Sequence, residues 1–199
     1  MRILLILVLS FPGMATVQAN PAAEAVIKAQ TELLLKRLQV EEKVRSDVDT
    51  VESLVVETIG QHVDFSLFSR LVLGKYRKRL TADEMTRFER GLTGVVIKTY
   101  AASLASVSGL EISYLGVQKG KEKRRVTVLT SVKSAGNPTV RIDYRLYQKD
   151  GQWKVYDVVI EGISMMMNYR TVLAEKIRSE GIEAVICSFD TAEKALAAS

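Results

Sequence analysis

Few residues of this 199-residue sequence have side chains suited to catalysis. His62 is the only histidine and Cys187 the only cysteine, so a site with several histidine ligands is excluded. A thiol–imidazole pair would require these two residues to meet. The sequence contains no glycine-rich phosphate loop, CxxC pair or G-x-S-x-G motif. We therefore predict no catalytic residue, no metal and no cofactor, and we expect the protein not to be an enzyme.

Asp157 and Glu161 form an acidic pair whose spacing does not suit catalysis. A separation of four residues across a strand end does not aim two carboxylates at one substrate bond. Asp157 falls on the same predicted strand face as Val155, so it is expected to be buried and to need a donor. Tyr169 and Arg170 on the following helix are the nearest candidates. In preference to a ligand site, we predict a structural latch made of Asp157, Glu161, Tyr169 and Arg170.

A strand that leads into a helix through a short bend positions these residues. Asp150-Gly151 is a hairpin-turn signal, and the aromatic and β-branched residues from Trp153 to Ile160 favour a strand. Ser164 can cap a helix that ends near Gly181. Met165–Met167 open this helix, and one helical stripe cannot hold three consecutive residues. Their flexible side chains either fill irregular gaps in a core or form a wall for a ligand of variable shape.

Helices are predicted over most of residues 20–107. Asn20-Pro21 begins the first, Asp64 can cap a short one, and Thr81 with Glu84 forms a capping box for the longest. The longest predicted helix also contains Gly91 and Gly94, each at a cost of about 1 kcal/mol relative to alanine. We therefore expect a neighbouring element, rather than a ligand, to approach the helix backbone there.

From residue 110 onward the apolar pattern changes to a period of two. Four strands joined by short turns are predicted over residues 110–118, 125–134, 139–148 and 152–160, which implies an antiparallel meander with one buried face. A last helix, Ile182–Phe189, should bury Cys187. Helices packed over one face of such a sheet can enclose an apolar cavity. We predict an α+β fold and one domain over residues 20–199, with helices over 20–107, strands over 110–160 and helices over 164–190.

The N-terminus has the pattern of a secretory signal peptide. One basic residue precedes the apolar run Ile3–Leu9, and Val17-Gln18-Ala19 supplies small residues at the cleavage site. The apolar run is too short to span a bilayer. We therefore predict a signal peptide over residues 1–19, cleavage after Ala19 and an exported product.

The chain has a formal net charge of +5. Export makes nucleic acid a poor candidate partner for this charge, and anionic lipid or an acidic protein face a better one. Lys75–Arg79 is a basic run with one aromatic residue. Such runs are usually solvated, and contact with lipid headgroups is the alternative.

Several segments, in this order, resemble one family. The first is W-x-V-Y-D-V-x-I-E-G-x-S from Trp153, followed by Asn168-Tyr169-Arg170. Others are Val63-Asp64-Phe65, Leu73-Gly74-Lys75-Tyr76 and the segment from Pro138 to Tyr144. Together they resemble the MlaC, or toluene-tolerance, family of periplasmic phospholipid carriers. The resemblance extends from about Val51 to Phe189.

The resemblance implies a twisted four-stranded antiparallel sheet with N-terminal and C-terminal helices enclosing an apolar pocket for acyl tails. It also implies two protein partners, an inner-membrane ABC transporter complex and an outer-membrane lipoprotein–porin complex. No short motif marks the lipid contacts, so the pocket residues are predicted from the apolar pattern. They are Phe65, Phe68, Val72, Tyr100, Leu104, Tyr144, Leu146, Trp153, Val155, Met165, Met166 and Met167.

Three alternatives remain open from the sequence. The ligand could be another lipid such as a hopanoid. The chain could instead be an exported interaction protein with a solid core. A small isomerase-like enzyme on a related sheet is the third alternative, and it would bring His62 and acidic residues together in a pocket.

Overall fold

The structure is a computed structural model that describes residues 20–40, 47–105 and 109–197, so the predicted signal peptide lies outside the described residues. Its helices are α1 (Pro21–Val40), α3 (Val48–Ile59), α4 (Phe65–Leu73), α5 (Ala82–Ala105), α6 (Met165–Glu180) and α7 (Ile182–Ala197), with 3-10 turns η1 (Gly60–His62) and η2 (Gly74–Arg79). Its strands are β1 (Glu111–Lys119), β2 (Arg125–Lys133), β3 (Val140–Lys149), β4 (Gln152–Ile160) and β5 (Ile163–Ser164).

The α+β prediction is confirmed, but the sheet has five antiparallel strands in sequence order where four were predicted. The additional strand, β5, has two residues and pairs with the end of β4. It forms because Glu161 (φ 49°) and Gly162 (φ 80°) both adopt positive φ. Two such residues in succession make the tight turn that returns a chain beside the strand it has just left. The sequence predicts only a short bend between strand and helix at this place, so the turn and β5 are a correction.

A bulge in β4 places Val155 and Asp157 on opposite faces of the sheet. Arg145 of β3 pairs with Asp157, whereas the next residue, Leu146, pairs with Val155. Tyr156 is therefore the extra residue of a β-bulge, which shifts the alternation of side chains by one position. The prediction that Asp157 shares a face with Val155 is wrong for this reason. We call the face with Leu146 and Val155 the inner face and the other the outer face.

The inner face packs against the first half of α1. The side chains of Ala23 and Leu146 in this core are completely buried. The hydroxyls of Thr31 and Tyr114 form a hydrogen bond of 2.7 Å that continues the contact to the edge strand β1. The core consists of Ala23, Ile27, Val117, Val126, Val128, Leu146 and Val155.

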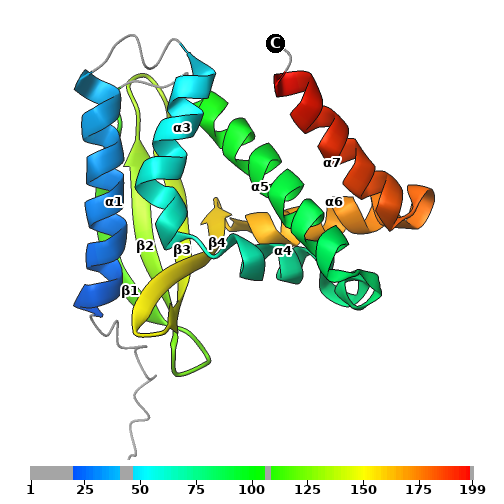
Figure 1. Cartoon of the computed structure of the whole chain (residues 1–199). Coiled ribbons are helices and arrows are strands. Elements are labelled where there is room, and N and C mark those ends of the chain that lie inside the picture. Colours follow the sequence, from blue (N-terminus) through cyan, green and yellow to red (C-terminus); the bar gives the residue numbers. More distant parts are fainter. Residues whose placement is uncertain (1–19, 41–46, 106–108, 198–199) are drawn as a thin grey trace, which may run out of the picture.

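Two further cores join helices to one another. One links the second half of α1 with α3 and the end of α5, through Leu34, Leu38, Val51, Leu54 and Ala101. The other links α4, η2, α6 and α7 with the first half of α5, and we call this group of elements the helical lobe. Figure 1 shows that α1 and α3 lie in front of the sheet, whereas the helical lobe extends to one side of it. The lobe core consists of Phe68, Val72, Leu73, Tyr76, Phe88, Leu92, Leu173, Ile177, Val185 and Ile186.

Helices α5 and α7 pack closely at Gly91. A Cβ atom at this position would lie 2.3 Å from the Cβ of Phe189, so only glycine fits. The expectation of a close neighbouring element is therefore confirmed at Gly91. It is wrong at Gly94, where nothing lies within 4 Å of such an atom.

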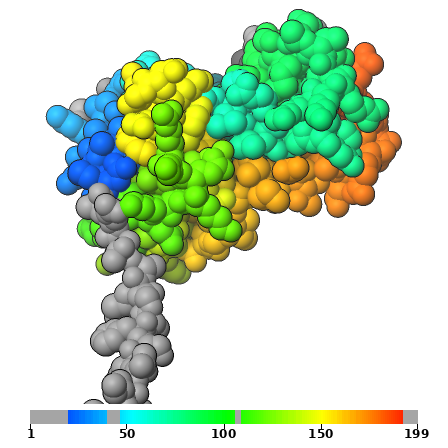
Figure 2. All heavy atoms as spheres, turned by 90° about the horizontal axis from the view of Figure 1, so that it is seen from below, coloured from blue at the N-terminus to red at the C-terminus, as the bar shows by residue number. Residues whose placement is uncertain are grey.

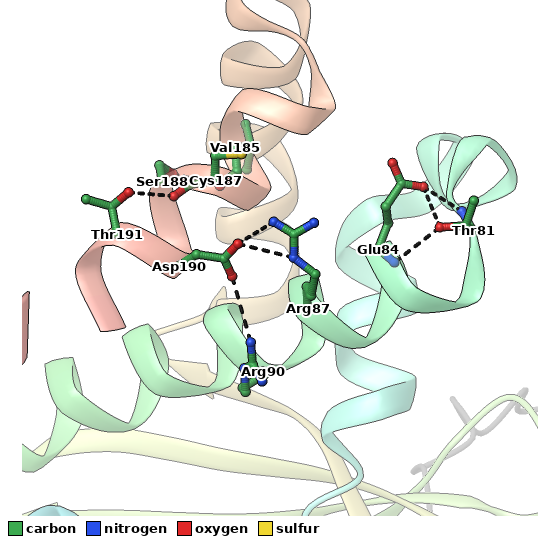
Figure 3. Close-up of polar contacts among 9 residues, drawn as sticks. All are labelled: Thr81, Glu84, Arg87, Arg90, Val185, Cys187, Ser188, Asp190 and Thr191. Carbon is green, nitrogen blue, oxygen red and sulfur yellow. Dashed lines mark hydrogen bonds and ion pairs between the residues drawn. The ribbon is translucent and has the colours of Figure 1, made fainter. Parts of the chain in front are cut away.

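Polar contacts beside this point also join α5 to α7 (Figure 3). Asp190 forms ion pairs with Arg87 and, at 3.9 Å, with Arg90. Cys187, on the same helix as Asp190, is exposed, so the prediction that it is buried is wrong. Helix α7 turns Val185 and Ile186 towards the lobe core, which leaves the adjacent Cys187 on the solvent side of the helix.

The predicted caps of two helices are present. The Glu84 carboxylate accepts from the amide of Thr81 at 2.8 Å, and the Thr81 hydroxyl accepts from the amide of Glu84 at 3.3 Å, as a capping box requires (Figure 3). Asp64 accepts from the amide of Leu67 at 2.8 Å at the start of α4. No helix in the described part of the chain is both long and apolar enough to cross a bilayer.

We predict opposite effects for alanine at the two glycines of α5. Gly91→Ala forces α5 and α7 apart and should lower the free energy of unfolding by about 1–3 kcal/mol, as overpacking does. Gly94→Ala meets open space and should raise it by up to about 1 kcal/mol through helix propensity. Urea unfolding of both variants measures the difference. Equal destabilisation by the two changes would contradict the close packing at Gly91.

Candidate functional site

Asp157 is a buried carboxylate with three hydrogen-bond donors. Its side chain is 0% exposed. Oδ2 accepts from Arg145 Nη1 at 2.9 Å and from the Ser164 hydroxyl at 2.6 Å, and Oδ1 accepts from the amide of Met166 at 3.0 Å. The cation comes from β3, the hydroxyl from β5 and the amide from the first turn of α6. One carboxylate therefore joins three elements.

Asp157 and Ser164 together accept from two of the free amides at the start of α6, those of Met166 and Met167. The Ser164 hydroxyl accepts from the amide of Met167 at 3.2 Å while it donates to Asp157. A negative charge at a helix N-terminus is stabilised by the exposed amides and the helix dipole. The first turn of α6, which carries the three methionines, is fixed to the outer face of the sheet in this way.

The donors to Asp157 differ from those predicted. Tyr169 packs edge-on against Phe68 in the helical lobe, with ring centroids 6.3 Å apart. The guanidinium of Arg170 lies over the backbone of Gly74. The prediction that either residue donates to Asp157 is therefore wrong, because both point into or along the lobe instead.

Glu161, the other acidic residue of the predicted latch, closes the end of the hairpin. Its carboxylate accepts from the backbone amide of Arg141, and its own amide donates to the Arg141 carbonyl at 2.9 Å. Glu161 therefore holds the β3–β4 ends together and makes no contact with Asp157. The two acids act at different places.

Asp64 is a second buried carboxylate that joins a helix to the sheet. Besides the α4 amide, it accepts from the Tyr147 hydroxyl and from Lys149 Nζ, the latter at 2.9 Å. Its own amide donates to the carbonyl of Val155 at 2.8 Å. Burial opposes the ionisation of Asp64, but hydrogen bonds from Tyr147, Leu67 and Lys149 outweigh it and hold its pKa below the usual 3.8.

An apolar area on the inner face lies outside all three cores. It occupies the end of the sheet beyond the sheet core, and its side chains are half-buried. Among the described residues, neither α3 nor α5 contributes to the sheet core, and no strand residue belongs to the core of α1, α3 and α5. We call this set the inner apolar area: Ile112, Val132, Val140, Ile142 and Ile160.

Two half-buried tyrosines, Tyr100 of α5 and Tyr169 of α6, lie near each other, and the methionine turn of α6 follows β5. Ile163 of β5 pairs with Ile160, so the methionine turn begins directly beside the inner apolar area. Tyr169 interacts with Thr99 of α5, and burial raises the pKa of Tyr169 despite this hydrogen bond. Burial, and to a smaller extent Tyr169, also raises the pKa of Tyr100.

Tyr144 marks the boundary between the sheet core and the inner apolar area. It flanks the sheet core and lies on the inner face between Leu146 and Ile142. Burial, with a smaller contribution from Tyr114, raises the pKa of Tyr144 to about 12. Its hydroxyl is therefore neutral at physiological pH and lies in an apolar environment.

The twelve predicted pocket residues are divided among different environments. Phe68 and Val72 are buried in the lobe core, and Leu146 and Val155 in the sheet core. Half-buried residues at the edges of the cores are Met166, Tyr144, Trp153 and Leu104. Phe65, Tyr100 and Met165 are half-buried outside the cores, and Met167 is 48% exposed. The structure thus does not gather the twelve into one lining.

The residues of the inner apolar area were absent from the predicted lining. The signal that could have identified them is the alternation of the third strand, where Val140 and Ile142 precede Tyr144 and Leu146 on the same face. Their half-burial could not be read from the alternation, because it depends on which part of the sheet the helices pack against.

A family model describing the MlaC protein matches residues 28–190. The chain belongs to the MlaC family. The predicted resemblance is therefore confirmed over most of the described residues, and this family is one of lipid-binding carriers and not of enzymes.

Two curated relatives extend this finding. The toluene tolerance protein ttg2D of Pseudomonas putida is 25% identical over 181 residues, which is 90% of this chain and 83% of the relative. The intermembrane phospholipid transport system binding protein MlaC of Haemophilus influenzae is 22% identical over 147 residues, 72% of this chain and 69% of the relative.

A solved structure has a similar fold. It is the phospholipid-binding protein from Ralstonia solanacearum in complex with a phospholipid, and it is 25% identical to this chain. The superposition has a TM-score of 0.79 and covers 88% of this chain and 98% of the other.

His62 does not form an acid–base pair in the described structure. Burial lowers its pKa, and the cation of Lys154 lowers it further. A cationic neighbour does not supply the carboxylate that the isomerase-like alternative requires. The described residues also contain no group of three or more histidine, cysteine, aspartate or glutamate side chains placed to hold a metal ion.

We predict that Asp157 is needed for stability. Asp157→Asn replaces an acceptor of three donors with a neutral group that must itself donate, so the free energy of unfolding should fall by about 1–3 kcal/mol. The matched control is Asp143→Asn on the outer face, whose ion pair with Arg141 is partly exposed. That change should cost less than about 1 kcal/mol. Urea titration measures the free energy of unfolding of both variants. Equal losses of this free energy would contradict the special role of Asp157.

We predict a pH-dependent contribution from Asp64. Because its folded pKa is depressed, the unfolded chain binds more protons near pH 4, and the stabilisation is present above the unfolded pKa. It is lost as the pH falls through the folded pKa. Asp64→Asn should therefore lower the melting temperature at pH 6 and have a progressively smaller effect towards pH 3. A constant difference between the two melting curves across this range would contradict the assignment.

Proposed function

We propose that this protein is a carrier that binds a phospholipid by its acyl tails. The observation that carries the proposal is the fold shared over 88% of the chain with a protein solved in complex with a phospholipid. Membership of the MlaC family and the name of the Haemophilus influenzae relative point to the same function.

The physical requirement for such a carrier is apolar surface and not reactive chemistry. Each methylene exposed to water costs about 0.8 kcal/mol, so one chain of about sixteen carbons costs roughly 12 kcal/mol in water. A carrier must supply an apolar environment comparable to the bilayer. Half-buried apolar side chains that no core uses are suited to this role.

We place the acyl tails between the inner apolar area and the nearby turns of α5 and α6. The half-buried Tyr100, Leu104, Tyr144, Met165 and Met166 complete this surface in the proposal. The flexible methionines adapt to tails of different length and unsaturation. The buried Phe68, Val72, Leu146 and Val155 support the walls from behind, with Phe65, Trp153 and Met167 at the periphery.

We further propose that the protein acts in the periplasm and moves lipid between two membrane complexes. The signal-peptide pattern of residues 1–19 supports export, with residues 20–199 as the mature domain. The Haemophilus influenzae relative is named for intermembrane phospholipid transport, which supports an exchange between membranes. The partners in this proposal are an inner-membrane ABC transporter complex and an outer-membrane lipoprotein–porin complex.

We predict that lipid copurifies with the protein and is lost when a charge enters the inner apolar area. Ile142→Asp places a carboxylate among the tails and should reduce bound lipid at least tenfold. Val56→Asp on α3 is the matched control, since Val56 is 47% exposed and lies outside the sheet, and it should keep the wild-type lipid content. Mass spectrometry of extracted lipid measures both, and thermal melts show whether each variant is folded.

Two outcomes would contradict the proposal. Wild-type protein that carries no lipid and takes none from vesicles would favour an exported interaction protein with a solid core. Lipid retained in a folded Ile142→Asp variant would place the tails elsewhere in the molecule. The mass of the extracted lipid also distinguishes a phospholipid from a hopanoid.

A further inference from the structure

Six basic residues form a patch on the helical lobe, separate from the inner apolar area. Five belong to α4 and η2 and one to α6, and all six are exposed. The segment from Phe65 to Leu80 contains no acidic residue. Within the described residues, none of the six forms an ion pair. We call this set the basic patch: Arg70, Lys75, Arg77, Lys78, Arg79 and Arg170.

The fold holds the patch in place from beneath. Tyr76 is buried in the lobe core and anchors η2 there. The Nζ atom of Lys75 lies 5.3 Å from the centre of the Tyr76 ring. Gly74 has φ +54°, and a Cβ there would lie 2.5 Å from Nη2 of Arg170. Glycine thus permits both the turn into η2 and the position of the Arg170 guanidinium beside it. The patch combines residues separated by about a hundred positions in the sequence.

The patch belongs to a wider basic face. Figure 2 shows that α4 and η2 reach the same side of the molecule as the β1–β2 and β3–β4 turns. The β1–β2 turn contributes the exposed residues Lys121, Lys123 and Arg124. Positive charge on several segments of one side creates an electrostatic field that attracts an extended anionic surface.

We propose that the basic patch docks the protein on the headgroup surface of an anionic lipid bilayer. The composition of the patch favours a bilayer over an acidic protein. The centres of protein interfaces are apolar and aromatic; lysine is depleted there, whereas arginine, which supplies four of the six patch residues, is enriched. The absence of an apolar centre, and not the arginine content, is therefore what favours a bilayer. Neither α4 nor η2 has an exposed large apolar residue. Helix α6 has two, Met167 and Val172, of which only Met167, three residues before Arg170, lies on the same helix face as Arg170. Flexible cations without an apolar centre suit the diffuse charge of headgroups.

This docking differs from the carriage of lipid and is tested separately. Lipid-loaded wild-type protein is sedimented with vesicles of phosphatidylcholine alone or mixed equally with phosphatidylglycerol. Binding to the mixed vesicles is expected at about 0.1 M salt and should be abolished at about 1 M, where the Debye length falls from about 10 Å to about 3 Å. Neutral vesicles should bind at most a tenth as much.

A variant with Lys75, Arg77, Lys78 and Arg79 changed to Gln tests the patch. Each cation near an anionic surface contributes roughly fivefold to partitioning, so the loss should exceed tenfold. The matched control changes Lys28, Lys36, Lys133 and Arg178 to Gln, which removes the same charge from exposed positions outside the patch, and it should lose less than threefold. If the fourfold patch variant does not fold, Lys75→Gln with Lys78→Gln should still show a clear partial loss.

The outcomes separate this inference from the proposed function. Absence of wild-type binding to anionic vesicles, or equal losses in the two fourfold variants, overturns the docking and leaves an acidic protein as the partner of the patch. Both fourfold variants should keep the wild-type amount of copurified lipid. Protein that binds anionic vesicles but contains no lipid would retain the docking and contradict the carrier.

Discussion

The buried carboxylate of Asp157 is the interaction on which the arrangement of sheet and lobe depends. It lies on the outer face only because the bulge at Tyr156 moves it away from the face of Val155. There it binds Arg145 of β3 and caps the first turn of α6. Without this charge the partly buried amide of Met166 would have no acceptor, at a cost of about 1–3 kcal/mol. The position of the methionine turn therefore follows from a single strand residue.

Asp64 makes the same kind of attachment between the sheet and α4. Each carboxylate caps a helix of the lobe and accepts from a basic residue of β3, Arg145 in one case and Lys149 in the other. Helices α4 and α6 also pack together through Phe68 and Tyr169. The lobe is thus attached to the sheet at two charged points and held together internally by apolar packing. Because a buried charge requires nearly all of its donors, these attachments allow little variation in the angle between lobe and sheet.

The apolar patterns and capping residues of the sequence were sufficient to predict much of the fold. The bounds of β4 agree with the prediction, the other three long strands differ by at most one residue at either end, and the caps at Asp64 and Ser164 are as expected. The wrong predictions about Asp157, namely its sheet face and its donors, depend on how β3 and β4 pair. The bulge in β4 is defined by its register with β3, and the donor Arg145 can be identified only once that register is known. The inner apolar area could not be identified from the sequence, because a half-buried strand residue cannot be told from a buried one by alternation.

The division of the apolar residues into three cores has an energetic consequence for a carrier. Full burial of a large apolar side chain stabilises a protein by about 1.5–3 kcal/mol. The five half-buried residues therefore lack about 4–7 kcal/mol of the stabilisation that full burial would give. This is comparable to the whole stability of a typical domain, about 5–15 kcal/mol. A lipid covering the inner apolar area would recover part of that free energy, and the protein would be stabilised by the molecule it carries. Under the proposed function, an incomplete core is therefore the physical source of the affinity for lipid.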